Sequence, residues 1–435
     1  MSVLRVSAGA VDLKPEPGMW MTGYGARIHP AAGTRDPIFA RAVLLDNQDT
    51  QLVMVSCDLL GLSAQSVFDI RAGVSERTGI CRDHILVSCT HTHSGPASLP
   101  MRGAMGHVDE QWLSTAKDRI VDLVSSLPKR LEPACLYRAS ARVPDIGFNR
   151  QDESRGIDDQ LIVIQLRSEQ GGTIATIANY ATHAVTLGSD NLQFSADFPG
   201  AMVRRIEGSL GGTAMYIQGA SGDANPIVHT PGDGWQAGTI DDVARIGNTL
   251  AQAAIEALTN ASPVPDVKLA AKSTTVEVPV EPLPDASEID KMKSFFESWK
   301  SDCAANNKPE EQALAQAMLD WTDELREASQ QNTAPRSVRA EIFTAAVGDL
   351  LLVALPFETY SGIALEIKKR LVSGRTLFAG YSNGLIGYCP TDWAKGQGGY
   401  GPVDSARWFC ALLTPVDYGA DELLITESVA LATTL

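Results

Sequence analysis

The sequence predicts a mixed α/β fold in which central mixed β-sheets are flanked by helices. Short apolar runs typical of buried strands alternate along the chain with amphipathic segments of helical spacing. Residues 51–89 have the order strand, helix, strand, which predicts a parallel pair joined by a right-handed crossover. Residues 285–335 differ, because they contain two amphipathic helices joined by a polar turn. We therefore expect a helical hairpin, called here the helical insertion, within the α/β fold.

The individual elements follow from the same patterns. Alternating or continuous apolar stretches predict strands, and apolar side chains three or four residues apart predict helices. We expect strands at 4–11, 43–46, 51–57, 85–89, 134–143, 161–166, 174–181, 213–217, 267–280 and 350–355. We expect helices around 67–74, at 110–127, from a cap at Asp197 through 207, at 240–258 and twice within 285–335.

Composition limits the function classes. A chain of 435 residues that is 44% hydrophobic can bury a large core. Its net charge of −16, without long like-charge runs, argues against nucleic acid or an anionic membrane as the main partner. The seven cysteines are scattered without CxxC spacing, which favours a reducing cytoplasm over a disulfide framework or a zinc finger. We expect no export signal and no membrane anchor, because no apolar run is suited to either.

Histidines and a glutamate follow the ends of three apolar strands. His91 and His93 come after 85–89 and are followed by a Ser-Gly-Pro bend, His183 comes after 174–181, and Glu358 after 350–355. Imidazole is the commonest metal ligand and the usual acid or base near neutral pH. A His-x-His pair can also have no functional role, with one ring packed in the core and the other in solvent. The crossover should place Asp58 and His91 at the same edge of the parallel pair.

These residues, with several downstream blocks, resemble the neutral/alkaline non-lysosomal ceramidase family. The similarity covers about residues 5–430, the catalytic part of that family, and predicts one catalytic domain over 1–435. The blocks that carry it are His91-Thr92-His93-Ser94-Gly95-Pro96, Asn149-Arg150, Thr182-His183, Gly222-Asp223-Ala224-Asn225-Pro226, Phe357-Glu358, Gly387-Tyr388 and Tyr400.

The resemblance implies a role for each of seven residues. It implies that one zinc ion per chain is held by two histidines, a glutamate and a tyrosine, at His91, His183, Glu358 and Tyr388. It implies that the scissile amide is handled by three further residues, at His93, Arg150 and Tyr400.

The chain also departs from the family pattern. Family members have Gly-Asp-x-Ser-Pro where this chain has Asn225 in place of the serine, which argues against a serine nucleophile. We expect a short bacterial-type member without the immunoglobulin-like C-terminal domain of the larger enzymes. These departures favour a substrate other than ceramide.

The predicted function is a zinc-dependent hydrolase. Two imidazoles, a carboxylate and a further oxygen ligand suit zinc, and zinc lowers the pKa of bound water to about 7, so that no serine is needed. Donors at His93, Arg150 and Tyr400 would stabilise charge on the carbonyl oxygen. We expect a small-molecule amide, ester or lactone as substrate. The sequence also offers three aspartates that could orient a metal ligand or act as the general base, and it does not rank them: Asp58, Asp197 and Asp223.

Three alternatives remain open from the sequence. The chain could be a non-catalytic binding protein stabilised by the metal, a true ceramidase acting on N-acyl-sphingosine, or a Cys/His hydrolase that uses Cys89 or Cys389. For both cysteines, packing as small apolar groups is the favoured interpretation. The aromatic residues of the helical insertion predict that it covers a cleft or pairs subunits in a homo-oligomer. The aromatics of loop 14–33, including Trp20 and Tyr24, could line a binding surface or cover the core.

Overall fold

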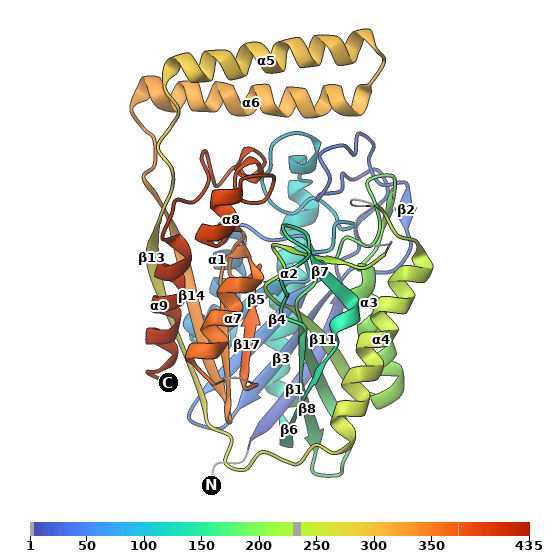
Figure 1. Cartoon of the computed structure of the whole chain (residues 1–435). Helices are drawn as coiled ribbons and strands as arrows, with labels where there is room; N and C mark the ends of the chain where they lie inside the picture. Colours follow the sequence, from blue (N-terminus) through green and yellow to red (C-terminus); the bar gives the residue numbers. More distant parts are fainter. Residues whose placement is uncertain (1–3, 229–235, 373) are drawn as a thin grey trace.

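The computed structural model describes residues 4–228, 236–372 and 374–435, and it confirms the mixed α/β fold (Figure 1). An eight-stranded sheet has the order β11-β9-β8-β6-β1-β3-β4-β5. Its strands are β1 (Arg5–Asp12), β3 (Phe39–Asp46), β4 (Gln51–Cys57), β5 (Ile85–Cys89), β6 (Glu132–Arg142), β8 (Gln160–Ser168), β9 (Thr173–Tyr180) and β11 (Thr213–Gln218). Strands β4 and β5 are parallel and are joined through helix α1 (Ala64–Thr78), as the sequence predicted.

A second sheet has four strands in the order β13-β14-β15-β17. These are β13 (Leu269–Pro279), β14 (Ser337–Val347), β15 (Leu350–Ala354) and β17 (Thr376–Ala379). Three short pairs complete the strands: β2 (Gly33–Thr34) with β10 (Gln193–Phe194), β7 (Gly147–Asn149) with β12 (Ala224–Pro226), and β16 (Phe357–Thr359) with β18 (Gly387–Cys389). The sequence did not predict these pairs, because two or three residues are too few to show a strand period.

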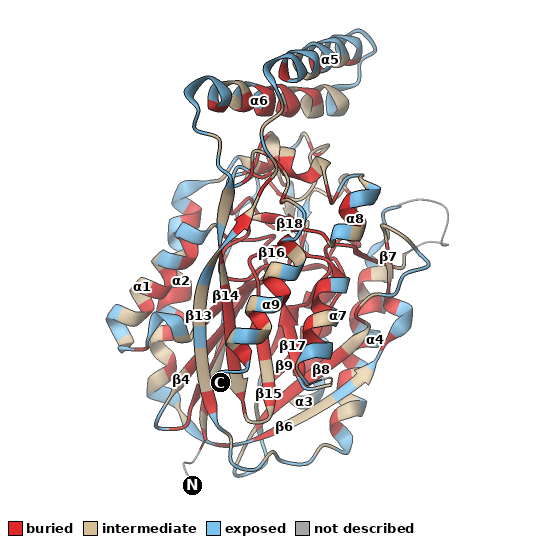
Figure 2. Ribbon diagram, turned by 60° about the vertical axis from the view of Figure 1, so that its left-hand side comes forward, coloured by how far each residue is buried: buried red, intermediate tan, exposed pale blue. Residues whose placement is uncertain are grey.

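The two sheets pack face to face. Because successive side chains of a strand point to opposite faces of its sheet, each strand contributes to two different cores. On β4, Leu52 and Met54 join a core shared with Phe343 of the second sheet, whereas Val53 and Val55 face a core that contains residues of α1 and of α2 (Glu110–Ser126). Burial on both faces makes such strands nearly continuous apolar runs. Figure 2 shows most strands buried and the outer faces of the helices exposed, whereas β6 and β13 are largely intermediate or exposed.

Helices cover both outer faces of this pair of sheets. Helices α1 to α4 pack on the eight-stranded sheet, and α7 and α9 pack on the four-stranded sheet. The remaining helix bounds are α3 (Asp197–Leu210), α4 (Ile240–Thr259), α7 (Ser361–Arg370), α8 (Asp392–Gln397) and α9 (Ala420–Ala432). Within the described ranges, no helix combines the length and apolarity that a membrane crossing requires.

The helical insertion consists of α5 (Ala286–Ala305) and α6 (Pro309–Gln331), which pack against each other. Figure 1 shows this pair lying across one end of the molecule, with α6 nearer to the sheets than α5. The indole nitrogen of Trp321 donates to the carbonyl oxygen of Leu413 at 2.8 Å, so α6 is attached to the loop that precedes α9. The apolar side chains at helical spacing within 285–335 therefore predicted both helices correctly.

Two local details differ from the sequence predictions. Helix α3 begins at Asp197 itself, and its N-cap is Ala196; the Asp197 carboxylate nevertheless accepts from the Phe198 amide at 2.6 Å. The chain turns already at His91, whose φ of 62° lies in the left-handed region, before the predicted Ser-Gly-Pro bend. A positive φ at a residue with a β-carbon is strained and is found preferentially at functional sites.

Candidate functional site

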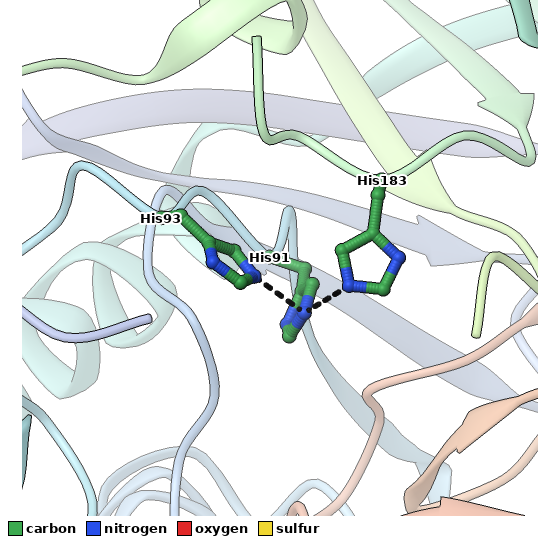
Figure 3. A group of neighbouring side chains, drawn as sticks. All are labelled: His91, His93 and His183. Carbon is green, nitrogen blue, oxygen red and sulfur yellow. Dashed lines mark hydrogen bonds between the residues drawn. The ribbon is translucent and has the colours of Figure 1, made fainter. Parts of the chain in front are cut away.

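Three histidine rings meet at the end of the eight-stranded sheet (Figure 3). His91 follows β5 and His183 follows β9, while His93 lies two residues beyond His91. The Nε2 atom of His91 lies 3.0 Å from Nε2 of His183 and 3.1 Å from Nε2 of His93. The ligand atoms of the three rings all lie within 4.8 Å of one another. The structure therefore brings these predicted residues together.

Backbone carbonyls orient two of the rings. Nδ1 of His91 lies 2.8 Å from the Leu60 carbonyl oxygen, and Nδ1 of His183 lies 2.6 Å from that of Ser221. A carbonyl only accepts, so each Nδ1 carries the proton and each Nε2 presents a lone pair. Burial and the nearby Arg150 charge lower the pKa of His183 to about 4, which keeps this imidazole neutral near pH 7. Two such lone pairs at 3.0 Å repel each other unless a proton or a cation lies beside them.

Glu358 completes the cluster from a different part of the fold. Its Oε2 lies 3.3 Å from Nε2 of His91 and 3.2 Å from Nε2 of His183, yet no hydrogen bond of good geometry reaches this buried oxygen within the described residues. Burial alone would raise the pKa of Glu358, but His91 and His183 hold it well below its usual range. A buried carboxylate beside the Nε2 atoms of two imidazoles is a donor set that fits a divalent cation.

Arg150, Tyr388 and Tyr400 lie together beside this cluster. Nη2 of Arg150 donates to the Tyr388 hydroxyl oxygen at 2.8 Å, and the rings of Tyr388 and Tyr400 are 6.0 Å apart. Tyr388 lies on β18, directly opposite Glu358 of β16 in the parallel register. Burial raises the pKa of Tyr388 well above its ordinary value, although the Arg150 charge lowers it.

These side chains open onto a cavity of about 700 Å³. His93, Arg150, Tyr388 and Tyr400 line it, whereas His91, His183 and Glu358 do not and are almost completely buried. A ligand in the cavity can thus contact four of the seven predicted residues. Such a cavity, with a few polar groups beside a buried polar cluster, is typical of a small-molecule site.

The three unranked aspartates differ in their contacts. Asp58 is bound by the Arg41 guanidinium at 2.9 Å, and Asp197 accepts from two backbone amides while burial raises its pKa to about 6. Asp223 accepts from the Ser361 amide at 2.7 Å and from the Asn149 side chain at 2.8 Å. Of the three, Asp223 is the one bound to the segment that carries Arg150. None of them lines the cavity.

Two further tyrosines lie at the site: Tyr381, to which the sequence assigned no role, and Tyr24, which the sequence left between a binding surface and the core. The Tyr381 ring packs on His91 with centroids 4.1 Å apart, and its hydroxyl lies 2.8 Å from Oγ of Ser221. Tyr24 lines the cavity, and its ring lies 5.1 Å from that of His93. The Gly-Tyr-Ser-Asn-Gly run that follows the apolar stretch 376–379 is the signal that would have indicated Tyr381.

Gly23 is required for His93 to take its position. A β-carbon added to this glycine would lie 2.6 Å from Cγ of His93, and the glycine has a φ of +105°. Both the close approach and the backbone conformation exclude other residues. The loop 14–33 therefore contributes to the site through Gly23 and Tyr24, whereas Trp20 packs on His107 outside the cavity.

The fold and the site define an α/β protein with a buried cluster of histidines and a carboxylate beside an open cavity. The chain belongs to the neutral/alkaline non-lysosomal ceramidase family, whose N-terminal region matches residues 6–231. The resemblance found in the motifs is thereby confirmed.

Known relatives and a solved structure agree with this assignment. Neutral ceramidase A of Dictyostelium discoideum is 24% identical over 263 residues, which are 53% of this chain and 37% of the relative. The neutral ceramidase of Pseudomonas aeruginosa is 25% identical over 270 residues, 56% of this chain and 40% of the relative. The alignments thus span less than half of these relatives. A crystal structure of the Pseudomonas protein matches with a TM-score of 0.73 and 19% identity over 100% of this chain and 75% of that chain, which shows a common fold.

Proposed function

We propose that this protein is a zinc-dependent hydrolase that cleaves an amide bond, or a small ester or lactone, with water as the nucleophile. The observation that carries the proposal is the meeting of the His91 and His183 Nε2 lone pairs with the unprotonated Oε2 of Glu358. This donor set suits zinc, and Tyr388 is the fourth ligand that we propose. When bound, zinc supplies Lewis acidity and lowers the pKa of water to about 7.

Residues that line the cavity would receive the carbonyl group. The Arg150 guanidinium is fixed by the Gly222 carbonyl and the Tyr388 hydroxyl, both at 2.8 Å from Nη2. We assign to Arg150, His93 and Tyr400 the stabilisation of negative charge on the carbonyl oxygen. Preorganised donors of this kind contribute about 10²–10³ in rate each. Asp223 would act by holding the Asn149-Arg150 turn in place, because its backbone oxygen accepts from the Arg150 amide at 2.7 Å.

The side chains around the site support water as the nucleophile. Asn225 lines the cavity at the family's serine position, and an amide cannot attack a carbonyl. Ser221 is buried, and its hydroxyl is bound to the Tyr381 hydroxyl. Burial raises the pKa of the Cys89 and Cys389 thiols well above their ordinary values, so neither is a thiolate near neutral pH.

The relatives' names guide the choice of substrates. Because they are called neutral ceramidases, N-acyl amides are the first class to test, with ceramide included. The exchange of serine for Asn225 leads us to expect better turnover of other amides, or of small esters or lactones, than of ceramide.

A substrate panel tests the proposed function. Zinc-loaded and chelator-treated protein should be compared on N-acyl amides, p-nitrophenyl esters, lactones and ceramide. We expect turnover by the zinc-loaded wild type and by a His29→Ala control, whose substituted residue is exposed and does not line the cavity, but not by His183→Ala. Zinc binding without turnover of any class would favour the non-catalytic binding protein. Undiminished turnover after removal of zinc would overturn the proposal.

A further inference from the structure

The turn after β17 is bound to β5 and β16 through one residue. Tyr381 donates its backbone amide to the Phe357 carbonyl at 3.1 Å, and its own carbonyl accepts from the Cys89 amide at 3.2 Å. Phe357 directly precedes Glu358, and Cys89 ends β5 two residues before His91. The φ of Tyr381 is 54°, which is uncommon for so bulky a side chain and persists only where the surroundings fix it. The backbone of Tyr381 therefore joins the segments that carry two of the proposed zinc ligands.

The side chain of Tyr381 packs on the imidazole of His91. The two ring centroids are 4.1 Å apart and the ring planes are inclined by 30°, so the rings are nearly stacked. The contact between Nδ1 and the Leu60 carbonyl fixes one point of the imidazole, and the phenol ring limits the rotation of its plane. The Tyr381 ring therefore helps to set the direction in which Nε2 of His91 points.

The hydroxyl of Tyr381 acts on the second histidine through Ser221. It lies 2.8 Å from Oγ of Ser221, and the carbonyl of this serine accepts from Nδ1 of His183 at 2.6 Å. A group of this kind, which does not touch the metal, fixes the tautomer and the orientation of a metal-binding imidazole. One phenol therefore reaches both histidines, His91 with its ring and His183 through Ser221.

We propose that Tyr381 is a positioning residue that sets the geometry of the zinc ligands His91 and His183 without binding the metal itself. The proposal rests on the zinc site of the proposed function. Loss of the hydroxyl should release the Ser221 carbonyl and, with it, the His183 ring, whereas loss of the whole phenol should also release the His91 ring. Zinc should then bind more weakly, because the freed ligands must be ordered each time the metal binds.

Competition for zinc with a chromophoric chelator tests this role without using turnover, on variants shown to be folded by circular dichroism. Tyr381→Phe removes the hydroxyl and keeps the ring, and Tyr381→Leu removes both. Ser221→Ala removes the same hydrogen bond from its other side. Tyr180→Phe is the matched control, because Tyr180 is also 1% exposed and its hydroxyl donates to the Val143 carbonyl at 2.6 Å, in the core beneath α3 and α4.

We expect Tyr381→Phe and Ser221→Ala each to raise the zinc dissociation constant about tenfold, and Tyr381→Leu to raise it further, towards about a hundredfold. The double variant Tyr381→Phe/Ser221→Ala should bind zinc as well as either single variant, because all three lack the same hydrogen bond. Tyr180→Phe should keep the zinc affinity of wild type, and zinc-saturated Ser221→Ala should keep its turnover.

Three results would overturn the inference: wild-type zinc affinity in both Tyr381 variants, an equal loss in Tyr180→Phe, or additive losses in the double variant. A zinc affinity that depends on Tyr381 in a protein without turnover of any substrate class would support the positioning role while contradicting the hydrolase function.

Discussion

Replacement of Tyr388 with phenylalanine should weaken zinc binding while leaving the fold almost unchanged. The change removes one oxygen, which now accepts from Nη2 of Arg150 at 2.8 Å. This nitrogen keeps its second acceptor, the Gly222 carbonyl at 2.8 Å, so Arg150 is not left unsatisfied. We expect the free energy of unfolding to change by less than about 1 kcal/mol. If the phenol oxygen is a ligand, zinc affinity should fall by at least about tenfold to a hundredfold, or roughly 1.4–2.8 kcal/mol.

Competition with a chromophoric chelator measures this affinity, and Tyr400→Phe is the matched control. Tyr400 lies in the same glycine-rich segment, but it is 51% exposed, whereas Tyr388 is buried. Tyr400→Phe should keep the zinc affinity of wild type and lower kcat. Equal zinc affinity in wild type and Tyr388→Phe would show that Tyr388 lines the cavity without binding the metal.

Three further outcomes are expected. Arg150→Lys should lower kcat about 10²–10³-fold with zinc content unchanged, and a wild-type kcat would remove Arg150 from the proposed carbonyl site. Ser221→Ala and Cys89→Ala should retain turnover, and an acyl adduct on any side chain in intact-mass spectra would refute attack by water. The Arg138 hydrogen bond lowers the pKa of Asp349, so the partly exposed pair should stabilise the fold by about 1 kcal/mol or less near pH 7. This contribution should be present above about pH 4 and should disappear as the pH falls through the lowered pKa. The free energy of unfolding in urea should therefore differ between wild type and Asp349→Asn near pH 7 but not in acid, and a difference that stays constant over this range would contradict the prediction.

The sequence predicted the strand ends better than the contacts between them. His91, His183 and Glu358 were found because each follows an apolar run. Their strands are not neighbours, because β9 and β5 lie near opposite ends of the eight-stranded order and Glu358 follows β15 of the second sheet. Asp58 has the same pattern at the end of β4, yet it is bound to Arg41 of β3. That ion pair depends on the side-chain packing at the end of two antiparallel strands, which no local pattern of residues reveals.

Loops and long-range polar contacts account for what the sequence missed. Tyr381 packs on His91 from a turn after β17, some 290 positions away along the chain. The helical insertion was located from its apolar period, but its attachment through Arg102 and Glu324 joins residues 222 positions apart. The roles of the seven predicted site residues and the division of the chain into domains stay predictions.

Metal content measured beside activity tests the central claim most directly. Wild type purified without added chelator should contain about one zinc per chain by inductively coupled plasma mass spectrometry. The double variant His91→Ala/His183→Ala should lose this zinc and its hydrolase activity together, because both substitutions remove an Nε2 of the buried cluster. The account predicts a folded double variant with less than about a tenth of the wild-type zinc. A double variant that retains full zinc occupancy, or full activity without zinc, would contradict it.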